Sequence, residues 1–207
     1  ITLRDPQCAM AYWGIAMSYF HLLWEPPTSE EIDHAWTALK NAKHVGAVTD
    51  RERMYIEALE SFYQDAGKTD HRSRLLAYEK AMERITIAYP DDQEAAILYA
   101  LALNASALKS DKTLANNKKA GEILLKVFQK LPDHPGVAHY IIHSYDSPRL
   151  ASQALNAARK YAKIAPAAPH ALHMPSHIFI RLGLWEDNVE TNIASARAGQ
   201  ENAWQSD

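Results

Sequence analysis

Histidine is frequent in this chain, and half of the histidines lie close together in the sequence. The 207 residues include ten histidines, and five of these fall in one short stretch. His139 and His143 are four residues apart, and His173 and His177 repeat that spacing 34 positions later. His170 precedes the second pair by three residues. Two positions of a recurring pattern therefore carry histidine twice.

This spacing has a chemical meaning if both segments are helical. Residues four apart on an α-helix share one face, with Cβ atoms about 5–6 Å apart. Neutral imidazole is a common ligand for zinc, copper and nickel. Asp146 lies three residues after His143, where its carboxylate can bind an ion or orient a histidine that does. We therefore predict a site for a divalent transition metal (Zn, Cu or Ni) at His139, His143, His170, His173, His177 and Asp146.

A second interpretation of the histidine pairs needs no metal. Repeats copy their residues, so a duplicated histidine can be a packing or hydrogen-bonding residue inherited twice, and such packing can respond to pH. Pro175 bears on both interpretations, because it lies between His173 and His177 and can kink the helix or delay its start. Pro169 is compatible with a helix start just before His170. The sequence leaves both interpretations open.

Other catalytic patterns are absent from the sequence. The metalloprotease motif H-E-x-x-H needs a glutamate directly after its first histidine, but Tyr140 and Met174 occupy that place. There is no G-x-x-x-x-G-K-[ST] phosphate loop and no G-x-S-x-G nucleophile elbow. The single cysteine, Cys8, lies far along the chain from the histidines, in a pattern typical of a buried helix. An enzyme is therefore expected only through a metal centre.

The composition of the chain indicates which secondary structure positions these residues. The chain is 47% hydrophobic and 23% charged and has seven glycines, which favours helices around a continuous core. A formal net charge of -3 leaves no overall basic field for nucleic acid or anionic lipid. No apolar run approaches the roughly 20 residues of a membrane helix. We expect no nucleic-acid binding and no membrane insertion.

Proline-containing turns divide the chain into similar segments. Proline after a helix cannot continue the hydrogen-bond ladder, and a polar residue behind it can cap the next helix. Such turns occur at Asp5-Pro6, Tyr89-Pro90-Asp91-Asp92, Leu131-Pro132-Asp133-His134 and Ala165-Pro166. The same order of large and small residues follows the first two turns, at Tyr12, Ile15, Ala16 and Tyr19 and at Ala96, Tyr99, Ala100 and Leu103. Second helices are indicated by Ala120, Leu124 and Val127 and by Ala154, Ala158 and Tyr161.

Pro132 and Pro166 are 34 residues apart, which is the period of the tetratricopeptide repeat, or TPR. The pattern resembles the TPR family across essentially the whole chain. The resemblance implies an all-α, right-handed superhelix of about five antiparallel helix pairs. The expected units of this single solenoid are residues 1–48, 49–91, 92–134, 135–168 and 169–207. Because residues 1–6 resemble a helix end and an inter-repeat turn, we expect a fragment of a longer chain.

Local signals refine these boundaries. Two capping boxes predict helix starts, one from Thr28 to Glu31 and one from Thr49 to Glu52. Residues 25–28 and 110–117 are longer than the TPR pattern requires, so we expect surface loops there.

The resemblance also implies where the histidines face. In TPR proteins the positions of both pairs line the concave groove, so the four imidazoles are expected to share one cavity. The segments 134–146 and 169–177 are similar to a largely uncharacterised group of bacterial TPR proteins. Three functions are compatible with this placement. The chain can be a module that coordinates a metal between consecutive repeats, or a metal-independent scaffold for a protein or peptide in the groove. The third is a metal-dependent enzyme. Trp13, Met17 and Phe20 are either an apolar partner-binding patch or core.

Overall fold

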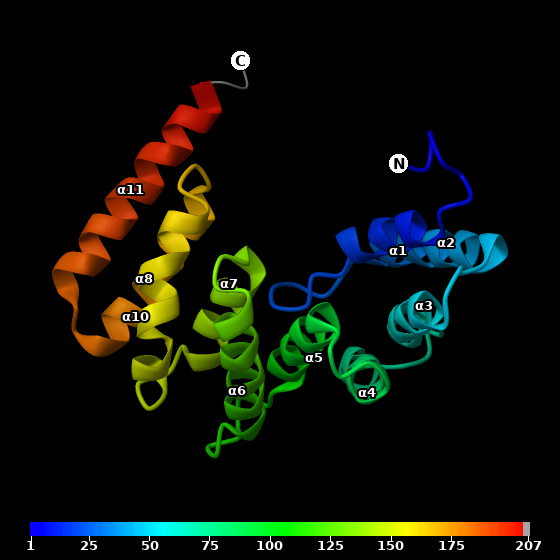
Figure 1. The fold of residues 1–207 in the computed structure, drawn as a ribbon, viewed down its shortest axis with the longest axis horizontal. Coiled ribbons are helices and arrows are strands. Elements are labelled where there is room, and N and C mark those ends of the chain that lie inside the picture. The colour runs from blue at the N-terminus through cyan, green and yellow to red at the C-terminus, as the bar shows by residue number, and fades with distance from the viewer. Residues whose placement is uncertain (205–207) are drawn as a thin grey trace. The chain divides into compact units, whose positions relative to one another are not determined.

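The computed structural model describes residues 1–204, and all regular secondary structure in that range is helical, with no strand. The predicted all-α fold of paired helices is therefore confirmed. Within the same range, no helix is both long enough and apolar enough to cross a membrane. By their internal contacts the residues divide into two compact units, 1–108 and 109–207, whose helices are drawn in Figure 1.

In the first unit each helix packs against the next one in the sequence. Helix α1 packs on α2 and also on α3, and α4 packs on both α3 and α5. The helices span α1 (Ala9–Ser18), α2 (Ser29–Val45), α3 (Asp50–Tyr63), α4 (His71–Ala88) and α5 (Gln93–Ser106).

Both predicted capping boxes begin helices of the first unit. At the start of α2, the Thr28 side chain accepts from the Glu31 backbone N–H, and the Glu31 carboxylate accepts from the Thr28 backbone N–H. Thr49 and Glu52 make the same reciprocal bonds at the start of α3. Each cap satisfies backbone donors that have no partner inside the helix, which stabilises it by about 1 kcal/mol.

Aromatic side chains fill the core of the first unit. Phe20 is only 8% exposed, and its ring packs edge-on against Phe62 and Tyr78, with ring centroids 4.5 and 4.7 Å away. Phe20 is therefore core rather than part of an exposed patch. Ile15, one of the large residues of the repeat pattern on α1, has a side chain that is 39% exposed. The neighbouring Ala16 is fully buried, and one residue along a helix turns the side chain by about 100°, so α1 points Ile15 outward.

The second unit follows the same plan. Helix α6 packs on α7, α7 on α8, α10 on α8, and α11 on both α9 and α10. The elements span α6 (Ala115–Lys130), α7 (Pro135–Tyr145), a short 3-10 helix η1 (Ala151–Ala154), α8 (Leu155–Ile164), α9 (Pro169–His173), α10 (Pro175–Leu182) and α11 (Trp185–Trp204). In this unit α9 and α10 follow each other directly, so the helical segment from Pro169 to Leu182 is interrupted.

The interruption lies at Met174, directly before Pro175. Proline has no N–H to donate to the preceding turn, so α9 ends there and α10 begins. Met174 nevertheless keeps right-handed helical dihedrals, and its N–H donates to the carbonyl of His170 at 3.0 Å. The chain therefore continues in nearly the same direction, and His173 and His177 lie about one turn apart despite the proline.

Close approach of α6 and α7 depends on one glycine. A Cβ atom at Gly121 would overlap the ring of Tyr145, and the Tyr145 side chain is fully buried. This contact fixes the end of α7, the helix that carries His139 and His143.

Candidate metal centre

Helix α7 places His139 and His143 on one face. The helix begins with Pro135 and is capped by His134, whose Nδ1 accepts from the Val137 backbone N–H at 3.3 Å. Four residues span slightly more than one turn, so the two rings face each other, with Nε2 atoms 3.0 Å apart. His139 is 8% exposed, and His143 is half-buried.

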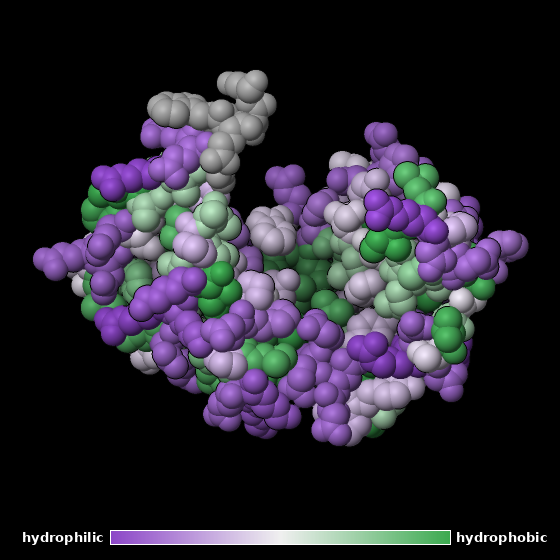
Figure 2. Space-filling model, turned by 45° about the horizontal axis from the view of Figure 1, so that its top comes forward, coloured by the Kyte–Doolittle hydropathy of each residue, from purple (hydrophilic) through white to green (hydrophobic). Residues whose placement is uncertain are grey.

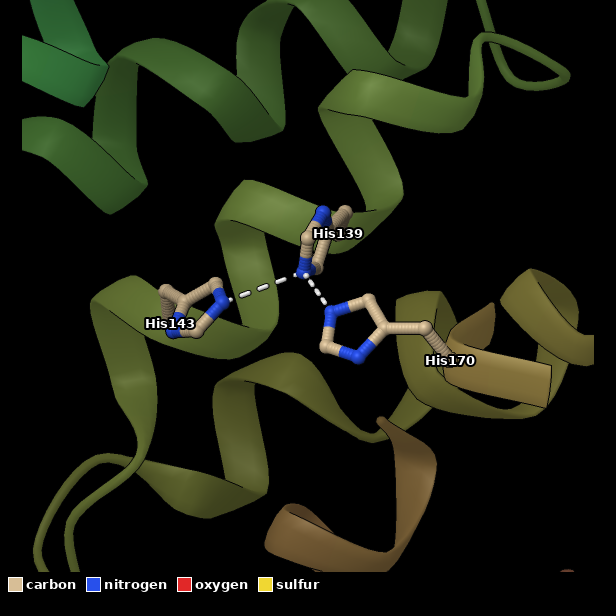
Figure 3. Close-up of side chains that lie close together, drawn as sticks. All are labelled: His139, His143 and His170. Carbon is tan, nitrogen blue, oxygen red and sulfur yellow. Dashed lines mark hydrogen bonds between the residues drawn. The ribbon is translucent and has the colours of Figure 1, made fainter. Parts of the chain in front are cut away.

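His170 joins this pair from another helix. It lies in the first turn of α9, and its Nε2 is 3.1 Å from Nε2 of His139 (Figure 3). One ligand nitrogen from each of the three residues lies within 4.8 Å of the other two. We call His139, His143 and His170 the histidine triad.

Hydrogen bonds alone do not explain why three imidazole nitrogens lie so close together. A neutral imidazole nitrogen carries either one proton or one lone pair, so it makes one well-aligned N–H···N bond. Nε2 of His139 has two nitrogen neighbours, His143 and His170, at hydrogen-bond distance. A cation placed among the three nitrogens would be bound by all three lone pairs at once.

Two tyrosines hold the central ring of the triad. Tyr161 stacks on His139 with a centroid separation of 5.4 Å and an interplanar angle of 12°. Tyr140 stacks on the same ring at 5.4 Å and 25°. Tyr161 is itself buried on α8. These contacts restrict rotation of His139 and so keep Nε2 directed at its two neighbours.

Burial also keeps the triad in the protonation state that binds metals. Removal from water, together with the positive charge that neighbouring histidines would carry, lowers the pKa of His139 to about 3 and that of His143 to about 4. The pKa of His170 is lowered for the same two reasons. At neutral pH the three imidazoles are uncharged, which is the form that coordinates transition metals without competition from protons.

The other predicted residues form a second group next to the triad. Nε2 of His173 lies 3.2 Å from Nε2 of His177. Nδ1 of His177 is 2.9 Å from a carboxylate oxygen of Asp146, whose other oxygen accepts from Nε of Arg181 at 2.9 Å. Burial raises the pKa of Asp146, but the bonds from His177 and Arg181 outweigh this and lower it overall. We call His173 and His177 the histidine pair.

The grouping differs from a single site formed by two i, i+4 pairs. His170 joins His139 and His143, whereas Asp146 contacts His177 of the second group. The two groups are nevertheless adjacent, because the ring centroids of His170 and His173 are 6.5 Å apart. Whether any of the six residues binds a metal stays a prediction.

Sequence reasoning missed two polar side chains that support the histidine pair. Arg181 lies four residues after His177, so helical spacing could have indicated it. Asn192 contacts Nδ1 of His173 at 2.8 Å from α11. No local signal identifies Asn192, because this contact depends on how α11 packs against α9.

Comparison with known proteins supports the fold class. No protein-family model matches the chain, and no curated protein matches it. A solved structure of a TPR-containing protein, "MamA MSR-1 C2", matches with a TM-score of 0.56, covering 94% of this chain and 98% of that one. At 13% sequence identity this likeness shows the fold alone. The chain therefore has a TPR-like helical-repeat fold, and its histidine cluster lies in the second unit.

Proposed function

We propose that this chain is a TPR-like module that binds a divalent transition metal, with the histidine triad as its primary site. The observation that carries the proposal is the position of His139 Nε2, at 3.0 and 3.1 Å from the Nε2 atoms of His143 and His170. The proposed ligands come from consecutive helix pairs, so the ion would join α7 to α9.

The nitrogen spacings agree with those around a bound ion. With metal–nitrogen bonds of about 2.0–2.1 Å, two ligand nitrogens are about 2.9 Å apart at a right angle and about 3.3 Å apart in a tetrahedron. The two spacings from Nε2 of His139 fall within that interval, and the third spacing, between His143 and His170, is at most 4.8 Å. Zinc, copper and nickel remain the candidate ions, because all three accept imidazole.

Three imidazoles leave at least one coordination position for another ligand. His170 is exposed, which gives an ion access from solvent and leaves room for water or for a donor from a partner. A three-ligand site with one such position is the arrangement that catalytic zinc enzymes use. Such a site could also catalyse a metal-dependent reaction, for which we assign no substrate.

The direct test is metal binding by protein without a histidine tag. We expect His139→Ala to weaken the first zinc or copper equivalent by at least about 100-fold in calorimetry, because loss of a ligand costs more than the 10–100-fold typical of its supporting groups. His44→Ala is the matched control, since His44 is an exposed histidine of α2 and its loss should leave affinity unchanged. Equal affinity in His139→Ala and wild type would refute the proposal.

A second function, protein or peptide binding, is favoured by the surface of α11. Most of the surface in view is hydrophilic, with apolar residues in separate patches (Figure 2). Trp185, Val189 and Ile193 are 63%, 57% and 47% exposed and follow one another at intervals of four residues, so they form an apolar stripe. Helical grooves bind amphipathic partners through such stripes. Replacing Val189 and Ile193 with lysine should abolish partner capture without changing metal affinity.

A further inference from the structure

In the histidine pair, the tautomer of each ring is fixed by the partner of its Nδ1 atom. Nδ1 of His173 faces Oδ1 of Asn192 at 2.8 Å. The orientation of this amide is set independently, since Nδ2 of Asn192 donates to the carbonyl of Asn188 at 2.8 Å. The oxygen of Asn192 therefore accepts, and Nδ1 of His173 carries the proton.

The same conclusion holds for His177. Its Nδ1 lies 2.9 Å from Oδ2 of Asp146. Oδ1 of Asp146 accepts from Arg181, and an ionised carboxylate has no proton to donate. Nδ1 of His177 is therefore the donor.

With both Nδ1 atoms protonated, the two Nε2 atoms of the neutral rings carry lone pairs. These atoms are 3.2 Å apart, so two lone pairs meet with no hydrogen between them. Such an arrangement is unfavourable unless a cation lies between the two nitrogens. That cation is either a metal ion or one shared proton.

We propose that His173 and His177 bind a second transition-metal ion beside the triad, so that the fully loaded protein holds two ions. This inference rests on the proposed function, because it assigns a further ion to the same histidine cluster. The preferred ions are again zinc, copper and nickel, since neutral imidazole suits these rather than magnesium or calcium.

Both histidines of the pair have the hydrogen-bond partners that are typical of metal ligands. Ligand histidines commonly donate their other ring N–H to a carboxylate or an amide or backbone carbonyl, which fixes the ring and makes it more basic. Asp146 does this for His177, and Asn192 does it for His173. The spacing of 3.2 Å also falls between the right-angle and tetrahedral values of about 2.9 and 3.3 Å.

Helix α9 supplies one ligand to each group, His170 to the triad and His173 to the pair, and these rings are 6.5 Å apart. Two divalent ions bound to these neighbouring groups would repel each other. The pair also offers two nitrogens where the triad offers three. We therefore expect sequential binding, with the triad filled first and the pair second.

The experiment is a zinc titration of the full tag-free chain by calorimetry, with bound zinc counted after gel filtration. We expect two zinc ions per chain in wild type and in His44→Ala. The double variant His173→Ala/His177→Ala should keep one tightly bound ion, and Asn192→Leu should weaken only the second ion, by at least about tenfold. Circular dichroism confirms that each variant remains helical.

The outcomes separate this inference from the proposed function. One ion in wild type, lost in His139→Ala but unaffected in the double variant, would overturn the second site and retain the first. One ion lost in either variant would indicate a single shared site and would also overturn it. No bound zinc would refute both proposals. Nitrogen NMR of the wild-type imidazoles provides a test without variants: a proton shared by His173 and His177, unchanged by zinc, contradicts the second site.

Discussion

At the scale of single residues, the candidate centre depends on which histidines are neutral and which nitrogen of each carries the proton. His139 is central to the triad because it is buried, stacked on Tyr161 and placed beside two other imidazoles. In the pair, the tautomers are set by Asp146 and Asn192. The chemistry therefore resides as much in the side chains around the imidazoles as in the imidazoles themselves.

Buried neutral histidines make stability depend on pH. An unfolded histidine has a pKa near 6.5, whereas the folded values are about 3 for His139 and about 4 for His143. Below pH 6.5 the unfolded chain binds more protons, so stability falls with decreasing pH until the folded values are reached. Between pH 7.5 and pH 5 the metal-free protein should lose about 2 kcal/mol for each of these histidines.

Urea unfolding at the two pH values, in the presence of a chelator, measures this loss. His139→Gln removes one of the two groups and should reduce the pH dependence, whereas His44→Gln should not. A free energy of unfolding that stays constant between pH 7.5 and pH 5 would show that these imidazoles are not held neutral by burial.

At the scale of helices, the centre requires α7 to be held in place by α6. The contact between Gly121 and the Tyr145 ring brings these helices together. We expect Gly121→Ala to destabilise the protein by about 1–3 kcal/mol through overpacking, despite the better helix propensity of alanine. Gly14→Ala is the matched control, because a Cβ there meets nothing within 4 Å, and it should be neutral or stabilising by up to about 1 kcal/mol. Equal thermal stability of the two variants would contradict this account of the α6–α7 contact.

Helix boundaries were largely predictable because their causes are local. The Thr28 and Thr49 capping boxes and the interruption before Pro175 involve residues within one turn of each other. Contacts between helices were less predictable. Joining His170 to His139 and placing Asn192 on His173 depend on how α7, α9 and α11 pack, and spacing along one helix does not determine that.

At the scale of the whole molecule, all six predicted ligands lie in the second of the two compact units. The first unit has its own polar anchor instead: Asp92 caps α5, accepts from Nε of Arg51 at 2.6 Å and accepts from the Tyr55 hydroxyl at 2.9 Å. Repeat proteins gain stability from each repeat and its neighbours. Metal binding should therefore stabilise residues 109–204 more than the first unit.

The most direct test of the central claim is X-ray absorption spectroscopy of the tag-free protein loaded with one equivalent of zinc. We predict imidazole nitrogens at about 2.0–2.1 Å from the metal, with three imidazoles per ion and a clear reduction of that number in His139→Ala. Because the triad offers three ligands, it should be the site that fills at this ratio. A zinc ion surrounded by oxygen ligands alone, or a spectrum that His139→Ala leaves unchanged, would contradict the assignment of the histidine triad as a metal centre.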